Sequence, residues 1–397
     1  TKKNRLFYKL LGHMMANAGL NPGYWWWYEY PKRAKFIFQC QGYCISNLNS
    51  ICFISQIVFL FLNFSTLNSS TLTIVYSILP IGFLTVVKSA SARTSSYKKV
   101  QTAFMENIHL YNYYRRNRTQ FVKTVIGLSS TVYFSLCMSI VIYSSWLNWM
   151  LTPIHYNIKN YQSILNGTTN FQTCCFMWMP FDYLYNYKNW LIANTINIYV
   201  TFFAVSVITI FDINKYCMIF NLIGHIQILK HNIRTRFSEG ISNDDIKNIM
   251  IDIIHHHHFI IRTLNELQTA YGVSVAADYL QNLVADGLFL YLFMLGDKQN
   301  VRTYGLLLLI YMGGLIIMSL VLEDIRRESE DLPETFYCCC SWENMSVSNQ
   351  KRFTIILVNL QSVLEFKVLG CFQTGILPAI SIIKTTFSYY VMIKSRM

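Results

Sequence analysis

The sequence predicts an all-α, polytopic membrane protein with seven transmembrane helices. Of its 397 residues, 53% are hydrophobic and only 13% are charged, whereas soluble domains carry about 25% charged residues. A transmembrane helix needs about 20 mainly apolar residues, and seven stretches have a suitable length. These stretches are residues 38–62, 71–90, 122–150, 189–211, 270–295, 303–322 and 369–397.

The basic residues predict the orientation of these helices. The net charge of +13 is interpreted as membrane topology and not as nucleic-acid binding. Lys and Arg concentrate in the N-terminal segment 1–37 and in the connections 91–121, 212–269 and 323–352. The positive-inside rule places these four parts in the cytoplasm. Seven crossings then put the N-terminus inside and the C-terminus outside, which is opposite to a G-protein-coupled receptor.

Two cytoplasmic parts carry helices of their own. Residues 212–269 have apolar residues at helical spacing on both sides of a polar break, which predicts cytoplasmic extensions of the fourth and fifth helices. An amphipathic stretch, 347–366, precedes the last helix. Since these apolar faces need a surface that buries them, we expect subunits to associate below the membrane. The predicted division is a cytoplasmic segment 1–37, transmembrane helices in 38–211 and 270–322, cytoplasmic anchor regions 212–269 and 323–368, and a last helix in 369–397.

Catalytic and metal-binding motifs are missing from the sequence. The run His255–His258 cannot place four imidazoles on one ion, because neighbours on a helix point about 100° apart. A solvated or interface helix face is the better interpretation of that run. For the run Cys338–Cys340, reduced surface thiols are a better interpretation than palmitoylated cysteines. Since no phosphate loop, nucleophile elbow or zincin motif occurs, we expect no enzyme activity, no metal and no cofactor.

Of the charged residues inside apolar segments, three lie well away from the segment ends. Asp278 and Asp286 are eight residues apart on one face of the fifth helix, and Lys384 lies midway along the seventh. Burying a charge in a membrane is costly, so such residues pair or face water. The sequence leaves open whether these three pair with one another or serve conduction.

The last apolar segment carries a stripe of small hydroxyl residues. A stripe of this kind indicates either a helix packing face or a wall of a water-filled pore. Met392 lies on the same stripe near its outer end, where a bulky apolar side chain can gate a pore by dewetting. The hydroxyl residues, which fall on one helical face, are Thr374, Ser381, Thr385, Ser388 and Ser395.

The outer halves of the other helices are rich in aromatic and hydroxyl residues, Trp149 among them. Bundled together, such residues line an apolar pocket with a few hydrogen-bonding groups, as small-molecule sites do. Plain core packing is the alternative for each of them. The candidate ligand-binding residues are Tyr76, Ser139, Ile142, Tyr143, Trp146, Ile198, Tyr199, Phe202 and Tyr304.

The C-terminal part of the chain resembles the insect odorant receptor family. The resemblance rests on Phe336-Tyr337 and Trp342 after the sixth helix, on the amphipathic stretch Lys351–Gln361, and on the tail Lys384–Tyr390 with its Ser-Tyr-Tyr end. In length, number of helices and inverted topology the resemblance extends over the whole chain. Gustatory receptors share this fold but end differently, and they remain the alternative, ahead of a G-protein-coupled receptor.

The resemblance implies an odorant-gated, non-selective cation channel of four subunits in the plasma membrane of olfactory sensory neurons. A small volatile odorant binds in the outer half of the helix bundle, the inner helices form an anchor domain, and the last helix of each subunit lines the pore. The gate position falls on Met392, with Thr385 and Ser388 on the pore wall and Ser395 and Arg396 just outside the gate.

The basic tail distinguishes this chain from the co-receptor Orco, whose tail is less basic and whose second inner loop is longer. Here the chain ends in Lys394-Ser395-Arg396 followed by one methionine. Four copies would place about eight positive charges at the outer mouth of a cation pore, which opposes cation entry. The sequence therefore predicts a tuning subunit that works with Orco, one copy with three co-receptor subunits.

Overall fold

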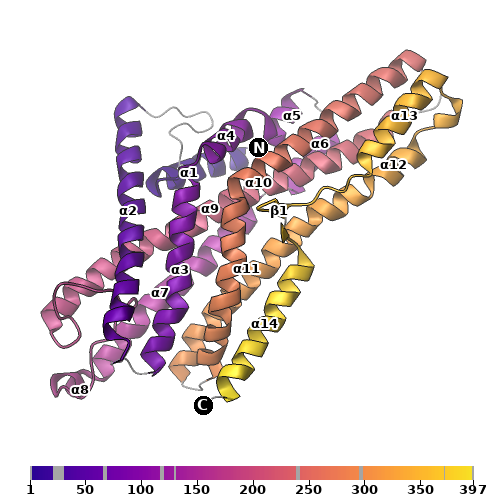
Figure 1. The fold of residues 1–397 in the computed structure, drawn as a ribbon. Coiled ribbons are helices and arrows are strands. Elements are labelled where there is room, and N and C mark those ends of the chain that lie inside the picture. Colours follow the sequence, from indigo (N-terminus) through magenta and orange to yellow (C-terminus); the bar gives the residue numbers. More distant parts are fainter. Residues whose placement is uncertain are drawn as a thin grey trace.

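The structure is a computed structural model, and it describes residues 2–20, 31–65, 69–116, 120–128, 131–237, 242–294, 298–370 and 372–395. Helices make up nearly all of these residues (Figure 1). The elements are α1 (Lys2–Asn17), α2 (Lys32–Asn63), α3 (Ser69–Ser91), α4 (Ser95–Ala103), the π-helix η1 (Phe104–Ile108), α5 (Leu110–Arg116), α6 (Gln120–Leu128), α7 (Thr131–Lys159), α8 (Tyr161–Leu165), α9 (Tyr187–Arg236), α10 (Asn243–Met294), α11 (Lys298–Glu330), α12 (Leu332–Cys339), the 3-10 helix η2 (Trp342–Asn344), α13 (Val347–Leu360), β1 (Lys367–Val368), β2 (Phe372–Gln373) and α14 (Ile376–Ser395).

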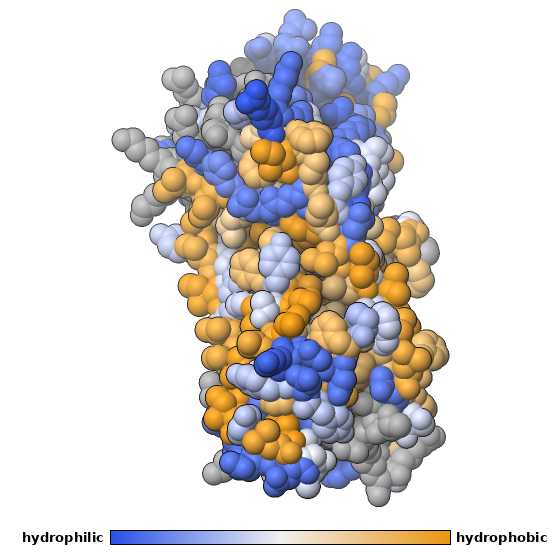
Figure 2. All heavy atoms as spheres, turned by 90° about the vertical axis from the view of Figure 1, so that its left-hand side faces the viewer, coloured by the Kyte–Doolittle hydropathy of each residue, from blue (hydrophilic) through white to orange (hydrophobic). Residues whose placement is uncertain are grey.

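Seven helices form the lower bundle of Figure 1, and each coincides with one predicted apolar segment: α2, α3, α7, α9, α10, α11 and α14. Within the residues that the structure describes, four helical stretches are long and apolar enough to cross a membrane: Lys32–Asn63, Val132–Lys159, Tyr187–Arg236 and Tyr304–Cys339. On the face shown in Figure 2, hydrophobic side chains gather over the middle and lower parts, whereas the upper part is mainly hydrophilic. The lower bundle therefore has the surface of a membrane domain.

The third predicted segment, 122–150, differs from the structure. Its first residues belong to α6, a separate helix that precedes α7, and α7 continues to Lys159. The apolar side chains Val122 and Val125 of α6 are buried against Ile228 of α9. Their hydrophobicity therefore serves a contact with the predicted cytoplasmic part of α9 and not a membrane crossing.

The last predicted segment also begins differently. The strands β1 and β2 form a short antiparallel pair in which Lys367 lies opposite Gln373, and α14 starts only at Ile376. Gly370 occupies the turn with a φ of 77°, a conformation in which glycine avoids the strain of a Cβ. Thr374 donates a hydrogen bond from Oγ1 to the Phe366 carbonyl (2.7 Å), so this residue belongs to the hairpin and not to the helical stripe.

The predicted extensions of the fourth and fifth helices are present as continuous parts of α9 and α10. These two helices have 50 and 52 residues and continue above the bundle in Figure 1. Ser242 caps α10, since its Oγ accepts a hydrogen bond from the Asp245 backbone N–H (3.2 Å). Next to this part lie α12 and α13, whose Phe336 and Phe353 rings stack with their centroids 4.8 Å apart.

A closed ring of four buried charges ties α3, α9 and α10 together. The Lys88 ammonium lies 2.7 Å from Asp212 and 2.8 Å from Asp278. Lys215 lies 2.9 Å from each of the same two carboxylates. Each charge thus has two partners of opposite sign, which offsets the large cost of removing it from water. We refer to these four residues as the charge ring.

The charge ring answers the question that the sequence left open about the intramembrane charges. Asp278 pairs with two lysines of other helices, and not with Lys384, which is exposed on α14. Asp286 is fully buried, and its carboxylate oxygens have no hydrogen-bond partner among the described residues.

The histidine run of α10 is partly solvated and partly packed against α9, in keeping with the predicted solvated or interface face. His255 and His258 are exposed, but His257 is buried and His256 lies beside His225 of α9. The Nε2 of His225 donates to the Ile108 carbonyl (2.8 Å), so its Nδ1 accepts from Nε2 of His256 (3.2 Å) when both rings are neutral. The described residues contain no group of three or more metal-ligating side chains placed to hold an ion.

We predict that opening the charge ring destabilises the protein more than removing a neutral pair from it. Lys88→Met leaves one buried carboxylate uncompensated, which costs about 3–5 kcal/mol. The double variant Lys88→Met with Asp212→Asn restores neutrality, so it should lie closer to the parent protein. Thermal unfolding of the detergent-purified proteins measures the stability of the single and the double variant relative to the parent. Lys99→Met is the matched control, because the Lys99 side chain is 72% exposed in its pair with Glu266; a single variant as stable as this control contradicts the prediction.

We also predict that acid weakens the contact between α9 and α10. Burial, with His225, Arg236 and His257 nearby, lowers the pKa of His256 to about 3. Below pH 6.5 the unfolded chain therefore binds a proton that the folded chain excludes, so stability falls as the pH drops from about 6.5 towards 3. Melting temperatures between pH 7.5 and 4.5 should fall less in His256→Phe than in the parent or in His255→Phe. An equal fall in melting temperature with pH for all three proteins would contradict the prediction.

Candidate ligand-binding site

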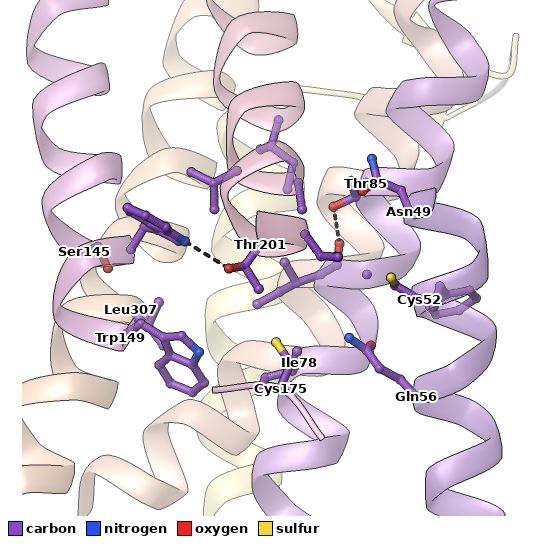
Figure 3. Close-up of a pocket in the computed structure, with 18 of the residues that line it drawn as sticks. Asn49, Cys52, Gln56, Ile78, Thr85, Ser145, Trp149, Cys175, Thr201 and Leu307 are labelled. Carbon is purple, nitrogen blue, oxygen red and sulfur yellow. Dashed lines mark hydrogen bonds between the residues drawn. The ribbon is translucent and has the colours of Figure 1, made fainter. Parts of the chain in front are cut away.

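An apolar cavity of about 140 Å³ lies between α2, α3, α7, α9 and α11 (Figure 3). We call it the outer cavity, because it lies in the half of the bundle that the sequence predicts to face outward. Its walls are aliphatic and aromatic, with Trp146 and Trp149 from α7 and Val200 from α9. Such a site binds through shape and apolar area, with a small number of polar groups for orientation.

The indole N–H groups of the two tryptophans and the Thr201 hydroxyl already have hydrogen-bond partners within the protein. The Trp146 indole N–H donates to Thr201 Oγ1 (3.2 Å), and the Trp149 indole N–H donates to the Cys174 carbonyl (3.0 Å). Thr201 in turn donates to the Asn197 carbonyl (2.7 Å). These bonds fix the rings in place, so both indoles offer a ligand an apolar surface.

The free hydrogen-bonding capacity of the outer cavity lies on α2. Asn49 and Gln56 are buried, and neither Asn49 amide atom nor the Gln56 carbonyl oxygen has a partner among the described residues. Figure 3 shows both side chains, with Cys52 between them, on the helix that faces Thr201 and Trp149. Sequence reasoning missed these residues; their seven-residue spacing within the apolar segment 38–62 is the signal that indicates one polar face.

The loop between α8 and α9, which we call the outer loop, forms part of the wall of this cavity. Cys175 and Met177 of the loop line the outer cavity. The loop is held to α9 by Asn197 Nδ2, which donates to the Cys175 carbonyl (3.0 Å). It is held to α2 by Ser55, whose hydroxyl donates to the Trp178 carbonyl (2.7 Å).

Two of the nine predicted ligand-binding residues line the outer cavity, Ile142 and Trp146. Ser139 donates to the Ser135 carbonyl of its own helix (2.8 Å), and Tyr143 donates to Ser206 of α9 (3.0 Å). Both therefore serve helix structure and packing.

The other predicted residues lie behind or outside the cavity wall. Tyr304 is buried and packs edge-on against Trp149, with ring centroids 5.8 Å apart, so it supports the wall from behind. The remaining four side chains are exposed on the outer surface of the bundle, where a membrane protein meets lipid. These are Tyr76, Ile198, Tyr199 and Phe202.

A second cavity, of about 400 Å³, lies next to the first along the bundle. We call it the inner cavity. Four residues line both cavities: Ile142, Ile208, Ile310 and Tyr311. The charge ring forms its floor, since all four ring residues line it.

The polar stripe of α14 has no packing role inside the described chain. Ser388 and Met392 are exposed, as is Ser395, and Thr385 is partly exposed. The hydroxyls bond to their own helix, as in the donation from Thr385 to the Ser381 carbonyl (2.8 Å). Arg396 lies outside the described residues.

The opposite face of α14 packs within the subunit. Thr386 is fully buried, and Gly287 of α10 lies against the Thr386 carbonyl and the Cβ of Tyr389. Comparison of the two faces indicates that the stripe points out of the subunit, whereas the face with Thr386 holds α14 to α10.

A bundle of apolar helices with an apolar cavity between them and an outward-turned last helix is the architecture expected of a membrane receptor for small apolar ligands. The family model 7tm Odorant receptor matches residues 94–387. The chain therefore belongs to the insect odorant receptor family, a family of receptors.

Solved structures show the same fold. The insect olfactory receptor OR5 from Machilis hrabei matches with a TM-score of 0.80 at 14% sequence identity, over 98% of this chain and 98% of that chain. The structure of that receptor in complex with eugenol also matches with a TM-score of 0.80 and 14% identity, over 99% of this chain and 98% of that chain. No curated protein sequence matches. The predicted family and the all-α insect olfactory receptor channel fold are thus confirmed.

Proposed function

We propose that this chain binds a small volatile odorant in the outer cavity and, in response, opens a non-selective cation channel. The observation that carries the proposal is an apolar cavity, walled by Trp146 and Trp149 and by the outer loop, in a chain of the odorant receptor family. The eugenol complex of the matched Machilis hrabei receptor supports a volatile ligand for this fold. Burial of apolar ligand surface contributes about 25 cal/mol of favourable binding free energy per Å².

A ligand opens the channel only if it binds the open bundle more tightly than the closed one. Contacts that run from the outer cavity through α11 and α10 to α14 offer a structural basis for this preference. Tyr311 of α11 lines the outer cavity and stacks on Phe289 of α10, with ring centroids 5.9 Å apart. Two residues earlier on α10, Gly287 contacts α14. A ligand that displaces Tyr311 therefore acts on the helix that we propose lines the pore.

The pore wall in this proposal is the outward stripe of α14, with Thr385 and Ser388 on the wall, Met392 as the gate, and Ser395 and Arg396 outside it. The exposure of the stripe supports an assembly with other subunits. Because Lys394 and Arg396 oppose cation entry when present in four copies, we propose one tuning subunit with three copies of the co-receptor Orco. The assembly would lie in the plasma membrane of olfactory sensory neurons, with the anchor regions joined in the cytoplasm.

We predict that cavity-lining and outward-facing aromatic residues differ in their effect on odorant sensitivity. Trp146→Ala should raise the half-maximal odorant concentration by about tenfold or more, which corresponds to about 1.4 kcal/mol. Tyr76→Ala and Tyr199→Ala are matched controls and should change it little, because both rings are exposed. Recordings with the co-receptor present measure this, with a co-receptor agonist as the control for assembly. A larger effect from Tyr76 than from Trp146 would place the site elsewhere.

We further predict that the chain expressed alone gives no odorant-evoked cation current, and that co-expression with Orco gives one. Replacing Lys394 and Arg396 by Gln should leave the heteromer active, because one basic tail among four subunits is tolerated. Whole-cell recording under both conditions tests this. Robust odorant-evoked current from the chain alone would overturn its role as a tuning subunit.

A further inference from the structure

We propose that the inner cavity is a second compartment of the ligand site, and that it selects a neutral ligand bearing a hydroxyl group, with its apolar tail in the outer cavity. This inference rests on the proposed odorant-binding function of the outer cavity. The two cavities are adjacent, since four residues line both, among them Ile208 and Ile310. In this proposal a ligand longer than the outer cavity passes between these shared side chains into the inner one.

Two unpartnered amide atoms identify the chemistry of the inner compartment. Gln281 and Asn282 line the inner cavity and are only 2% and 4% exposed. Among the described residues, neither Gln281 Nε2 nor Asn282 Oδ1 has a hydrogen-bond partner. The Asn282 amide is held in place by its own Nδ2, which donates to the Asp278 carbonyl (2.7 Å). One unpartnered donor and one unpartnered acceptor thus lie on adjacent residues at the wall of the inner cavity, and in this proposal the two side chains turn towards a ligand that enters it.

A hydroxyl group matches this pair, because it accepts one hydrogen bond and donates another. A carbonyl, ester or ether oxygen only accepts, so it leaves Asn282 Oδ1 unpaired, and an alkane leaves both amide atoms unpaired. A buried polar atom without a partner is costly, so a ligand that pairs both atoms gains relative to these analogues.

The charge ring explains why the ligand should be neutral. All four ring residues lie at the cavity floor, but each lysine is already within 2.9 Å of two carboxylates. No ring charge is left without an opposite partner, so an ionised ligand would enter without a counter-charge. Desolvating such an ion is unfavourable, and an uncharged alcohol avoids that cost.

The α11 wall of the inner cavity has room for a ligand. Gly313 and Gly314 line it, and a Cβ built on either residue meets no atom within 4 Å. A side chain added there occupies cavity space without displacing the protein. Gly314→Val is therefore a steric probe of the inner cavity that leaves the outer cavity unchanged.

The test uses the full chain co-expressed with Orco and a panel of straight-chain primary alcohols of six to ten carbons, each with its methyl ether and n-alkane. We expect at least one alcohol to act at a concentration tenfold or more below its methyl ether. Gln281→Met with Asn282→Leu should abolish this preference, and Gly314→Val should weaken the alcohol response. Removing unpaired buried polar atoms is not expected to impair folding. Val284→Met, on an exposed part of α10, is the matched control and should retain the preference.

Two outcomes would overturn the assignment: no alcohol preferred over its methyl ether, or a preference that survives in the Gln281–Asn282 double variant. The proposed function fails separately. Other volatiles could evoke currents that depend on Trp146 while no alcohol is preferred over its methyl ether. That result would support the outer cavity as the odorant site and would refute the inner cavity as a hydroxyl-selective compartment. If no volatile evokes a Trp146-dependent current, the outer cavity itself is not the site.

Discussion

The charge ring is the constraint on which the arrangement of the bundle depends. Its four residues come from three helices that are far apart in sequence, and each lysine must reach both carboxylates at hydrogen-bonding distance. Losing one partner leaves a buried charge uncompensated, which is among the largest penalties a single substitution imposes. The ring therefore fixes the height and rotation of α3, α9 and α10 relative to one another, and it fixes the floor of the inner cavity.

The rotation of α9 shows how the ring positions the ligand site. With Asp212 and Lys215 held in the ring, the residues three or four positions apart on the same helical face also point inward. That face includes Ile208, Ala204 and Thr201, which line the outer cavity. The opposite face, with Tyr199, is exposed. The ion pairs of the charge ring thus determine which side chains of α9 line the outer cavity.

This dependence explains what sequence reasoning predicted and what it missed. Hydropathy is a local property, so it indicated the seven apolar segments, and helical periodicity along α7 indicated Ile142 and Trp146. The rotation of α9 is not local, because it follows from partners on α3 and α10. Tyr199 was chosen for its chemistry, and the structure places it on the exposed face of α9, away from the outer cavity. Similarly, the hydrophobicity of Val122 does not reveal whether a helix meets lipid or, as here, the Ile228 side of α9.

The last helix shows that a single subunit is an incomplete description of the molecule. Lys384 is exposed midway along α14 and lies beside the hydroxyl stripe, where Ser388 donates to its carbonyl (3.0 Å). A charge at that depth in a membrane faces water or protein and not lipid. The satisfied hydroxyls alone would be compatible with lipid, but the lysine is not. The exposed lysine therefore supports the proposed pore, in which the outward face of α14 meets water or another subunit.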